Sequence, residues 1–383
     1  MIIEVRGTGT HNKGAELMLC AIRQHYCRAE SDVQLAVDPF FGSYADRARY
    51  GLLSKVRPIG LGRAAVAQRM MSPAFRKTYG LVVDSDIDAV LDASGFAYGD
   101  QWGMQPTQTA AREAIKLRRT GRTLVLLPQA FGPFSGRELA SQARRLIESA
   151  ALVFARDDAS FRHVQELGGP YEHVHRAPDF SMIVTGCVPS AFDSPANLVC
   201  VVPNIRMLDR GTESDRNAYV GFLAACIREA REHDLEPMYL FHDAATDRQV
   251  AEMVDARLGF PLARIDESRP ERLKGILGQA HVVVGSRFHA LVGALSQAVP
   301  CIVAGWSHKY EMLLQDFGCE PFLLSPTSPD EDIRTLFDRV TDARLRGEIV
   351  ARLRERGDGL RAQVDAMFRR VDETLAAREA VPA

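Results

Sequence analysis

The sequence predicts an α/β protein with two domains, each built on a largely parallel sheet. Short apolar runs of strand length alternate with helical patterns in both halves of the chain. At 383 residues the chain is too long for one ordinary core. Proline and serine accumulate at Val188–Pro195, which is typical of a linker. We therefore expect domains at residues 1–190 and 191–345 and a helical tail at 346–383.

The composition is that of a soluble globular protein, with 46% hydrophobic and 25% charged residues. A formal net charge of −2 gives no sign of nucleic-acid binding. The seven cysteines form no CxxC pair and their number is odd, which favours reduced thiols over disulfides or a zinc site. We find no signal peptide and no apolar run of about 18 residues. The expected location is the cytoplasm, either free or at the inner face of the membrane.

The chain is expected to begin with a strand, a glycine-rich turn and a helix. The strand is Ile2–Val5, and the helical pattern runs from Ala15 to about Cys27. The turn GTGTHNKGAE matches neither GxGxxG nor the P-loop, so a phosphate-binding turn and a turn that only caps the helix are both open. Asn12 is the expected helix cap, and Glu16 suits the first turn.

The remaining elements continue the alternation. The expected strands are Val33–Val37, Asp88–Ala93, Thr123–Leu127, Leu152–Phe154, Leu198–Val202, Pro237–Phe241, Val282–Val284 and Cys301–Ala304. The expected helices are Gln108–Arg119, Glu138–Ser149, Asn217–His233, Asp247–Leu258, Pro270–Gln279, Phe288–Gln297 and a tail from about Glu331. The basic segment from Phe40 to Gly80 is expected to be irregular, with a helical piece near Ala64–Met70. The loop SGFAYGDQWG suits either a sugar contact or packing by its own aromatic rings.

Candidate chemistry gathers on the β-α-β unit near the end of the second domain. Arg287 and His289 follow its first strand, and Ser307, His308 and Lys309 follow its second strand. Ligands of parallel sheets bind outside the carboxyl ends of the strands, so two fixed cations and an imidazole are expected to converge. Such a set suits a multiply charged anion with a proton donor beside it. Each residue alone could be a surface or cap residue, but their position at the same end of one sheet favours a binding site.

Several motifs resemble those of the polysaccharide pyruvyl transferase family. They are RGTGTHNKGAELML, LPQAFGPF, FARDDAS, APDF, VVPN and GSRFHALVGALSQAVPCIVAGWSHK. The resemblance runs to about Gly318, and its last motif is the most specific, because Arg287, His289 and Lys309 fall where the family keeps an R-x-H pair and a later lysine. It implies two Rossmann-like domains facing each other, as in GT-B glycosyltransferases, with the acceptor on the N-terminal side and the donor on the C-terminal side.

The resemblance also implies a reaction. Phosphoenolpyruvate is the expected donor, and a sugar diol, free or on a lipid- or nucleotide-linked glycan, is the expected acceptor. The product is a pyruvate ketal on an exopolysaccharide, a cell-wall glycan or a precursor. Arg156, Arg287 and Lys309 would clamp the donor's phosphate and carboxylate. His289 would act as general acid toward the enol carbon, with His308 next in line. No metal or cofactor is expected.

Two further expectations concern Arg156 and Arg287. Arg156 could instead pair structurally with a nearby acid. Removing Arg287 is expected to weaken donor binding with little loss of fold stability.

The substrate-binding turn departs from the family pattern. Many members have an aspartate after the glycine, as in N-x-G-D-E, whereas this chain has Asn12, Lys13, Gly14, Ala15 and Glu16. The acid is therefore missing at Ala15, and whether Glu16 replaces it is open.

Two other functions stay open. A GT-B glycosyltransferase that uses a nucleotide sugar would share the architecture, and it would need an acidic ribose partner, for which Glu311 is the near candidate. A non-catalytic relative that binds a glycan or phosphate is the other. The sequence predicts neither the acceptor sugar nor the oligomeric state.

Overall fold

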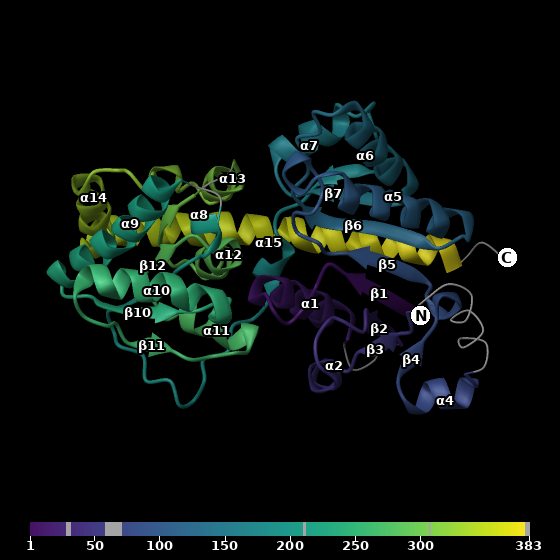
Figure 1. The fold of residues 1–383 in the computed structure, drawn as a ribbon, viewed down its shortest axis with the longest axis horizontal. Coiled ribbons are helices and arrows are strands. Elements are labelled where there is room, and N and C mark those ends of the chain that lie inside the picture. The colour runs from purple at the N-terminus through teal and green to yellow at the C-terminus, as the bar shows by residue number, and fades with distance from the viewer. Residues whose placement is uncertain (28–31, 58–70, 210–211, 306–307, 380–383) are drawn as a thin grey trace. The chain divides into compact units, whose positions relative to one another are not determined.

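The computed structural model describes residues 1–27, 32–57, 71–209, 212–305 and 308–379 (Figure 1). These residues form two compact units. The first contains residues 1–11, the described residues of 18–180, and those from Gln363 onward. The second contains Asn12–Leu17 and the described residues of 181–362. The domain bounds expected from the sequence stay predictions. The expected helix at Ala64–Met70 lies outside the described residues.

The first unit is built on one eight-stranded sheet in the order β4-β3-β2-β1-β5-β6-β7-β8, in which all neighbours are parallel. Its strands are β1 (Ile2–Arg6), β2 (Gln34–Val37), β3 (Leu53–Lys55), β4 (Leu81–Val82), β5 (Ala89–Asp92), β6 (Thr123–Gln129), β7 (Leu152–Ala155) and β8 (Val174–Arg176). Its helices are α1 (Lys13–Tyr26), whose residues up to Leu17 belong to the second unit, α2 (Tyr44–Tyr50), α4 (Pro73–Thr78), α5 (Met104–Arg119), α6 (Arg137–Ser149) and α7 (Asp158–Gln165). Helices α5 and α6 pack side by side against this sheet and share its apolar core (Figure 1).

The second unit is built on a six-stranded parallel sheet in the order β11-β10-β9-β12-β13-β14. Its strands are β9 (Leu198–Val202), β10 (Glu236–Leu240), β11 (Arg264–Ile265), β12 (Val282–Gly285), β13 (Cys301–Ala304) and β14 (Leu323–Leu324). Its helices are α8 (Arg206–Asp209), α9 (Glu213–Glu232), α10 (Ala244–Leu258), α11 (Pro270–Leu277), α12 (Phe288–Leu295), α13 (His308–Asp316), α14 (Asp330–Thr341) and α15 (Ala343–Glu379), whose end belongs to the first unit. Strands β9, β12 and β13 are buried throughout, as a parallel sheet covered on both faces requires.

The strand order of the second sheet reverses between β9 and β12. At such a switch point the connections diverge to the two faces, and a crevice opens outside the carboxyl ends of the strands. A Cβ on Gly285 would lie 2.4 Å from the carbonyl oxygen of Val202, so only glycine lets the ends of these strands lie so close. The chain continues into Asn204 after β9 and into Ser286 after β12, and Asn204 Nδ2 donates to the Ser286 carbonyl at 2.7 Å. This bond joins the two sides of the switch point.

The predicted fold class is confirmed, and the differences concern short elements. The segment expected to be irregular contains α2, β3 and α4. Strands β8, β11 and β14 were not expected either, because two or three residues carry too little alternation to be recognised. The tail is two helices, α14 and α15, with Asp342 in extended conformation between them.

Candidate functional site

Arg287 lies at the switch point, where a buried carboxylate fixes its orientation. Its Nε donates to Asp247 Oδ2 at 3.0 Å, and its Nη2 pairs with the other carboxylate oxygen. Asp247 is fully buried and also accepts from the backbone N–H groups of Ile205 and Asp243, each at 3.1 Å. Burial raises the pKa of Asp247, although Arg287 opposes that shift. The pair is bidentate, so the guanidinium plane is fixed and Nη1 is the nitrogen not engaged with Asp247.

His289 is the second residue of α12 and lies against the first turn of α1. A Cβ built on Gly14 would lie 2.2 Å from His289 Nδ1 and 2.9 Å from His289 Cβ. Turning the ring cannot relieve both contacts, because the second involves Cβ, whose position is fixed by the backbone. Phe288 meets the imidazole edge-on, with ring centroids 5.5 Å apart. The glycine in the turn is therefore needed for the close approach of His289.

The rest of the turn is held by its own polar groups. Asn12 Oδ1 accepts from the Gly14 N–H at 2.9 Å, so the predicted cap is confirmed. Lys13 Nζ pairs with Glu16 at 2.7 Å, and Glu16 is fully buried. Glu16 is therefore no exposed replacement for the acid that is missing at half-buried Ala15.

Sequence reasoning missed His242, which belongs to the same corner of the sheet. It follows β10 and is 5% exposed. Its backbone carbonyl accepts from the Lys13 N–H at 3.4 Å. Burial first, and then the positive charges of Arg287, His289 and Lys13, lower the pKa of His242 to about 3. The available signal was the polar run HDAATD directly after a predicted strand, which also contains Asp247.

Lys309 and His308 begin α13, and both are half-buried. Lys309 Nζ lies 5.1 Å from the Tyr310 ring centroid and 5.6 Å from that of Phe288. The Tyr310 hydroxyl donates to the Ser286 carbonyl at 2.8 Å, so α13 is anchored on the turn that precedes Arg287. Lys309 and His289 thus share Phe288 as a neighbour. Ser307 lies outside the described residues.

Arg156 belongs to the first unit, whereas the other predicted donor ligands belong to the second. It is 5% exposed, and its Nη1 lies 3.3 Å from Asp179, the acid of the APDF motif. The expected alternative, a structural pair with a nearby acid, is thereby confirmed. The role of Arg156 as a donor ligand stays a prediction.

The glycine- and aromatic-rich loop of the first unit is packed by its own rings and by Phe131, which follows β6. Tyr98 stacks on Phe131 with centroids 6.2 Å apart, and its hydroxyl donates to buried Asp92 at 2.6 Å. Phe96 meets Trp102 edge-on at 5.9 Å. These contacts support the packing alternative, while the 42% exposed Trp102 is the ring available to a sugar.

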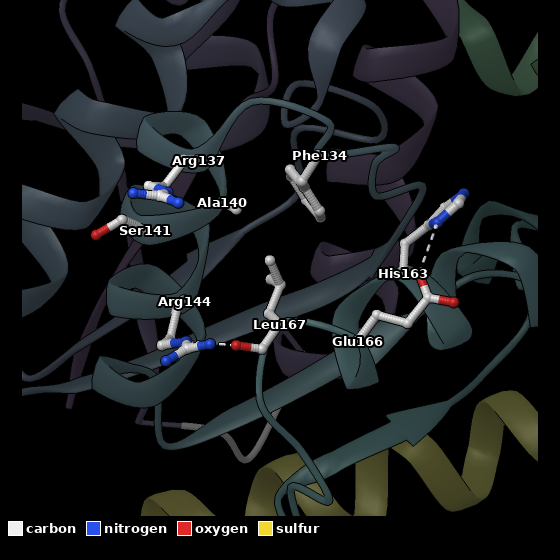
Figure 2. A pocket seen from close by; sticks show the side chains of 8 residues that line it. All are labelled: Phe134, Arg137, Ala140, Ser141, Arg144, His163, Glu166 and Leu167. Carbon is white, nitrogen blue, oxygen red and sulfur yellow. Dashed lines mark hydrogen bonds and ion pairs between the residues drawn. The ribbon is translucent and has the colours of Figure 1, made fainter.

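A separate hollow of about 340 Å³ lies on the first unit between α6 and α7 (Figure 2). In Figure 2, Phe134 and Leu167 point toward each other across its middle. Arg144 donates to the Leu167 carbonyl, and His163 lies 3.7 Å from Glu166. This hollow contains none of the predicted catalytic or substrate-binding residues, although Phe134 is the last residue of the LPQAFGPF motif.

Other expectations concern groups distributed along the chain. All seven cysteines are free, with Cys27 and Cys187 exposed and the other five buried. Among the described residues no group of three or more His, Cys, Asp or Glu side chains could hold a metal ion. Within the same ranges, no helix combines the length and apolarity needed to cross a membrane.

Comparisons with known proteins give one family and one fold. A family model described as polysaccharide pyruvyl transferase matches residues 12–308. No curated protein matches the chain significantly. The UDP-GlcNAc 2-epimerase of Neisseria meningitidis, bound to UDP-GlcNAc, superimposes with a TM-score of 0.57 at 8% identity, covering 98% of this chain and 100% of the epimerase.

Two further solved structures agree. HepE of Anabaena, in complex with UDP and glucose, superimposes with a TM-score of 0.57 at 14% identity, covering 98% of this chain and 99% of HepE. MnaA of S. aureus with UDP superimposes with a TM-score of 0.57 at 11% identity, covering 100% of this chain and 98% of MnaA. At such identities the likeness shows the fold alone, which is the GT-B-like pair of Rossmann-like units expected from the sequence.

Proposed function

The chain belongs to the polysaccharide pyruvyl transferase family, and we propose that it transfers pyruvate from phosphoenolpyruvate to two neighbouring hydroxyls of a sugar, forming a ketal. One observation of the site supports this most: Arg287, His289 and Lys13 all lie near enough to His242, at the carboxyl edge of the second sheet, for their charges to lower its pKa. A fixed cation beside an imidazole suits a donor that carries a phosphate and a carboxylate and must be protonated on carbon.

Donor binding through Arg287 and Lys309 is assigned to the second unit. Arg287 is held rigidly by Asp247, and Lys309 stands at the start of α13 with its Nζ 5.6 Å from the ring centroid of Phe288, the neighbour of His289. Each charge-assisted hydrogen bond contributes about 1.5–3 kcal/mol, so two such contacts supply about 3–6 kcal/mol. Arg156 is kept in the proposal as a donor ligand on the strength of its FARDDAS motif.

The reaction needs one proton on carbon before the sugar attacks. His289 gives a proton to the methylene carbon of the enol, and the neighbouring carbon becomes electrophilic. A sugar hydroxyl attacks that carbon, the C–O bond to phosphate breaks, and the second hydroxyl closes the ketal. Two hydroxyl protons are lost in all. One restores His289, and the other leaves with the phosphate, so protons and charges balance.

The acceptor side is defined less closely. Because Ala15 replaces the family acid and Glu16 is buried against Lys13, the first turn of α1 supplies no exposed carboxylate as a base. We assign the second hydroxyl proton to the departing phosphate for this reason. The proposed acceptor is a glycan or its lipid- or nucleotide-linked precursor, and the proposed location is the cytoplasm.

The experiment is a direct assay with two arms. The purified chain is incubated with phosphoenolpyruvate and a panel of sugar diols, and phosphate release is measured together with the pyruvyl mass increment on the sugar. The second arm supplies UDP-sugars, because the structural neighbours were solved with UDP ligands. Acceptor-dependent phosphate release with the mass increment supports the proposal. Turnover of a UDP-sugar with no consumption of phosphoenolpyruvate contradicts it.

A further inference from the structure

His242 is a buried histidine that the proposed chemistry does not use. It stands at the carboxyl edge of the second sheet, beyond β10, which lies beside β9 in the strand order. It is 5% exposed, and its Nε2 has no hydrogen-bond partner among the described residues. Buried polar atoms in proteins nearly always have partners, so a buried ring nitrogen without one needs a physical reason.

The charges around His242 favour its neutral form. The charged or titratable groups at this corner are Lys13 from α1, Asp243 and Asp247 from the cap and first turn of α10, and Arg287 and His289 from the end of β12 and the start of α12. Asp247 is engaged with Arg287, and burial adds to the effect of the positive neighbours. With its pKa lowered to about 3, His242 carries one N–H donor and one acceptor nitrogen at neutral pH.

We propose that His242 is a second anion-binding histidine of the donor site, which contacts the same multiply charged anion as Arg287 and takes up a proton when that anion binds. The negative charges of the anion raise the pKa of His242, because they stabilise the imidazolium. The imidazolium donates from both ring nitrogens, so the Nε2 gains a partner in the complex. The proposal rests on the proposed function in one respect, that the anion is phosphoenolpyruvate.

The sign of the pH dependence follows from linkage. Without the anion His242 is unprotonated at pH 7, so any proton on its ring in the complex has been taken up on binding. Affinity is therefore highest below the pKa that His242 has in the complex. Between the pKa of about 3 without the anion and the higher pKa in the complex, the dissociation constant rises by up to about tenfold per pH unit for one linked proton, and above the pKa in the complex it levels off.

Calorimetry of the full chain measures this proton directly. Phosphoenolpyruvate is titrated at one pH in buffers of different ionisation enthalpy, and the buffer dependence of the heat gives the number of protons taken up. We expect wild type to take up more protons than His242→Gln, by up to one, and to bind more tightly. His289→Gln should still show the proton uptake that is due to His242. His233→Gln is the matched control, because His233 pairs with Asp338 and Glu229 outside this corner and should change neither quantity.

A second measurement does not depend on a variant that folds. Nitrogen NMR of histidine-labelled wild type should show the His242 ring neutral without phosphoenolpyruvate and protonated with it. Unchanged proton uptake and affinity in His242→Gln, or a ring that stays neutral in the complex, would overturn the inference while phosphoenolpyruvate binding stands. A wild-type chain that binds no phosphoenolpyruvate overturns the inference and the proposed function together, and so differs from the first outcome.

Discussion

Gly14 and His289 are separated by so little space that no side chain fits between them, since a Cβ on Gly14 would lie 2.2 Å from His289 Nδ1. The contact joins the first turn of α1 to the start of α12, and both belong to the second unit. It holds the general-acid candidate in one place. The glycine of the turn is thus part of the positioning of His289.

Gly14→Ala is expected to lower transfer by about 10²–10⁴-fold, the range for a general acid, because the methyl group displaces His289. Helix propensity alone would favour alanine by about 0.8–1 kcal/mol, so propensity cannot cause a loss. Steady-state phosphate release, measured beside His289→Ala and the double variant, checks this. The double variant should be no slower than the slower single variant, because both changes remove the same function.

The matched control is Gly347→Ala in α15, where an added Cβ meets nothing within 4 Å. This change should leave transfer unchanged and stabilise the fold by up to about 1 kcal/mol. Full activity in Gly14→Ala would show that His289 can move aside without cost, and the positioning role of Gly14 would be lost.

Arg287 is expected to matter for stability as well as for binding, which revises the expectation from sequence. Arg287→Met leaves the fully buried Asp247 without its cation, and breaking a buried pair in this way costs about 3–5 kcal/mol. The variant Arg287→Met/Asp247→Asn should recover most of the free energy of unfolding but not the donor affinity. Urea unfolding and calorimetry measure the two quantities.

The control for Arg287 is Arg206→Ala, which removes an exposed pair with Asp209 and should cost at most about 1 kcal/mol. If Arg287→Met keeps wild-type affinity for phosphoenolpyruvate, the arginine is structural only.

Lys309 is expected to contribute to donor binding with a small effect on stability. Its ammonium rests near two aromatic rings, a contact that contributes about 0.5–1 kcal/mol at exposed sites. Losing a charge-assisted contact to the donor should cost about 1.5–3 kcal/mol of binding free energy in Lys309→Ala. Lys309→Arg should retain part of the affinity, because charge is kept while its placement changes. Normal donor binding by Lys309→Ala would remove this residue from the clamp.

The part of the site that follows directly from strand ends could be predicted from the sequence. Arg287 and His289 come just after a buried apolar run, and parallel strands bring such residues to one edge. The first turn of α1 was found by its glycines, but the reason for Gly14 was not visible, because its neighbour His289 is 275 residues away (289 − 14 = 275). Close approaches between distant segments leave no local pattern.

His242 and Asp247 were missed for a related reason. Both lie in a polar run after β10, and such a run is equally typical of a solvated loop. Only the strand order, which places β10 beside β9, brings this run to the switch point. The same limit applies to Arg156, since its partner Asp179 could be named only after folding. Local pattern predicts elements, whereas partners require the topology.

The measurement that tests the central claim most directly is turnover in D₂O with phosphoenolpyruvate and an accepted sugar diol, followed by mass spectrometry of the product. Protonation of the enol carbon by His289 places one deuterium in the methyl group of the ketal, and His289→Gln should slow its formation by about 10²–10⁴-fold. The account predicts a singly deuterated pyruvyl ketal from wild type. A ketal without deuterium, an equally fast His289→Gln variant, or transfer from a nucleotide sugar in place of phosphoenolpyruvate would contradict it.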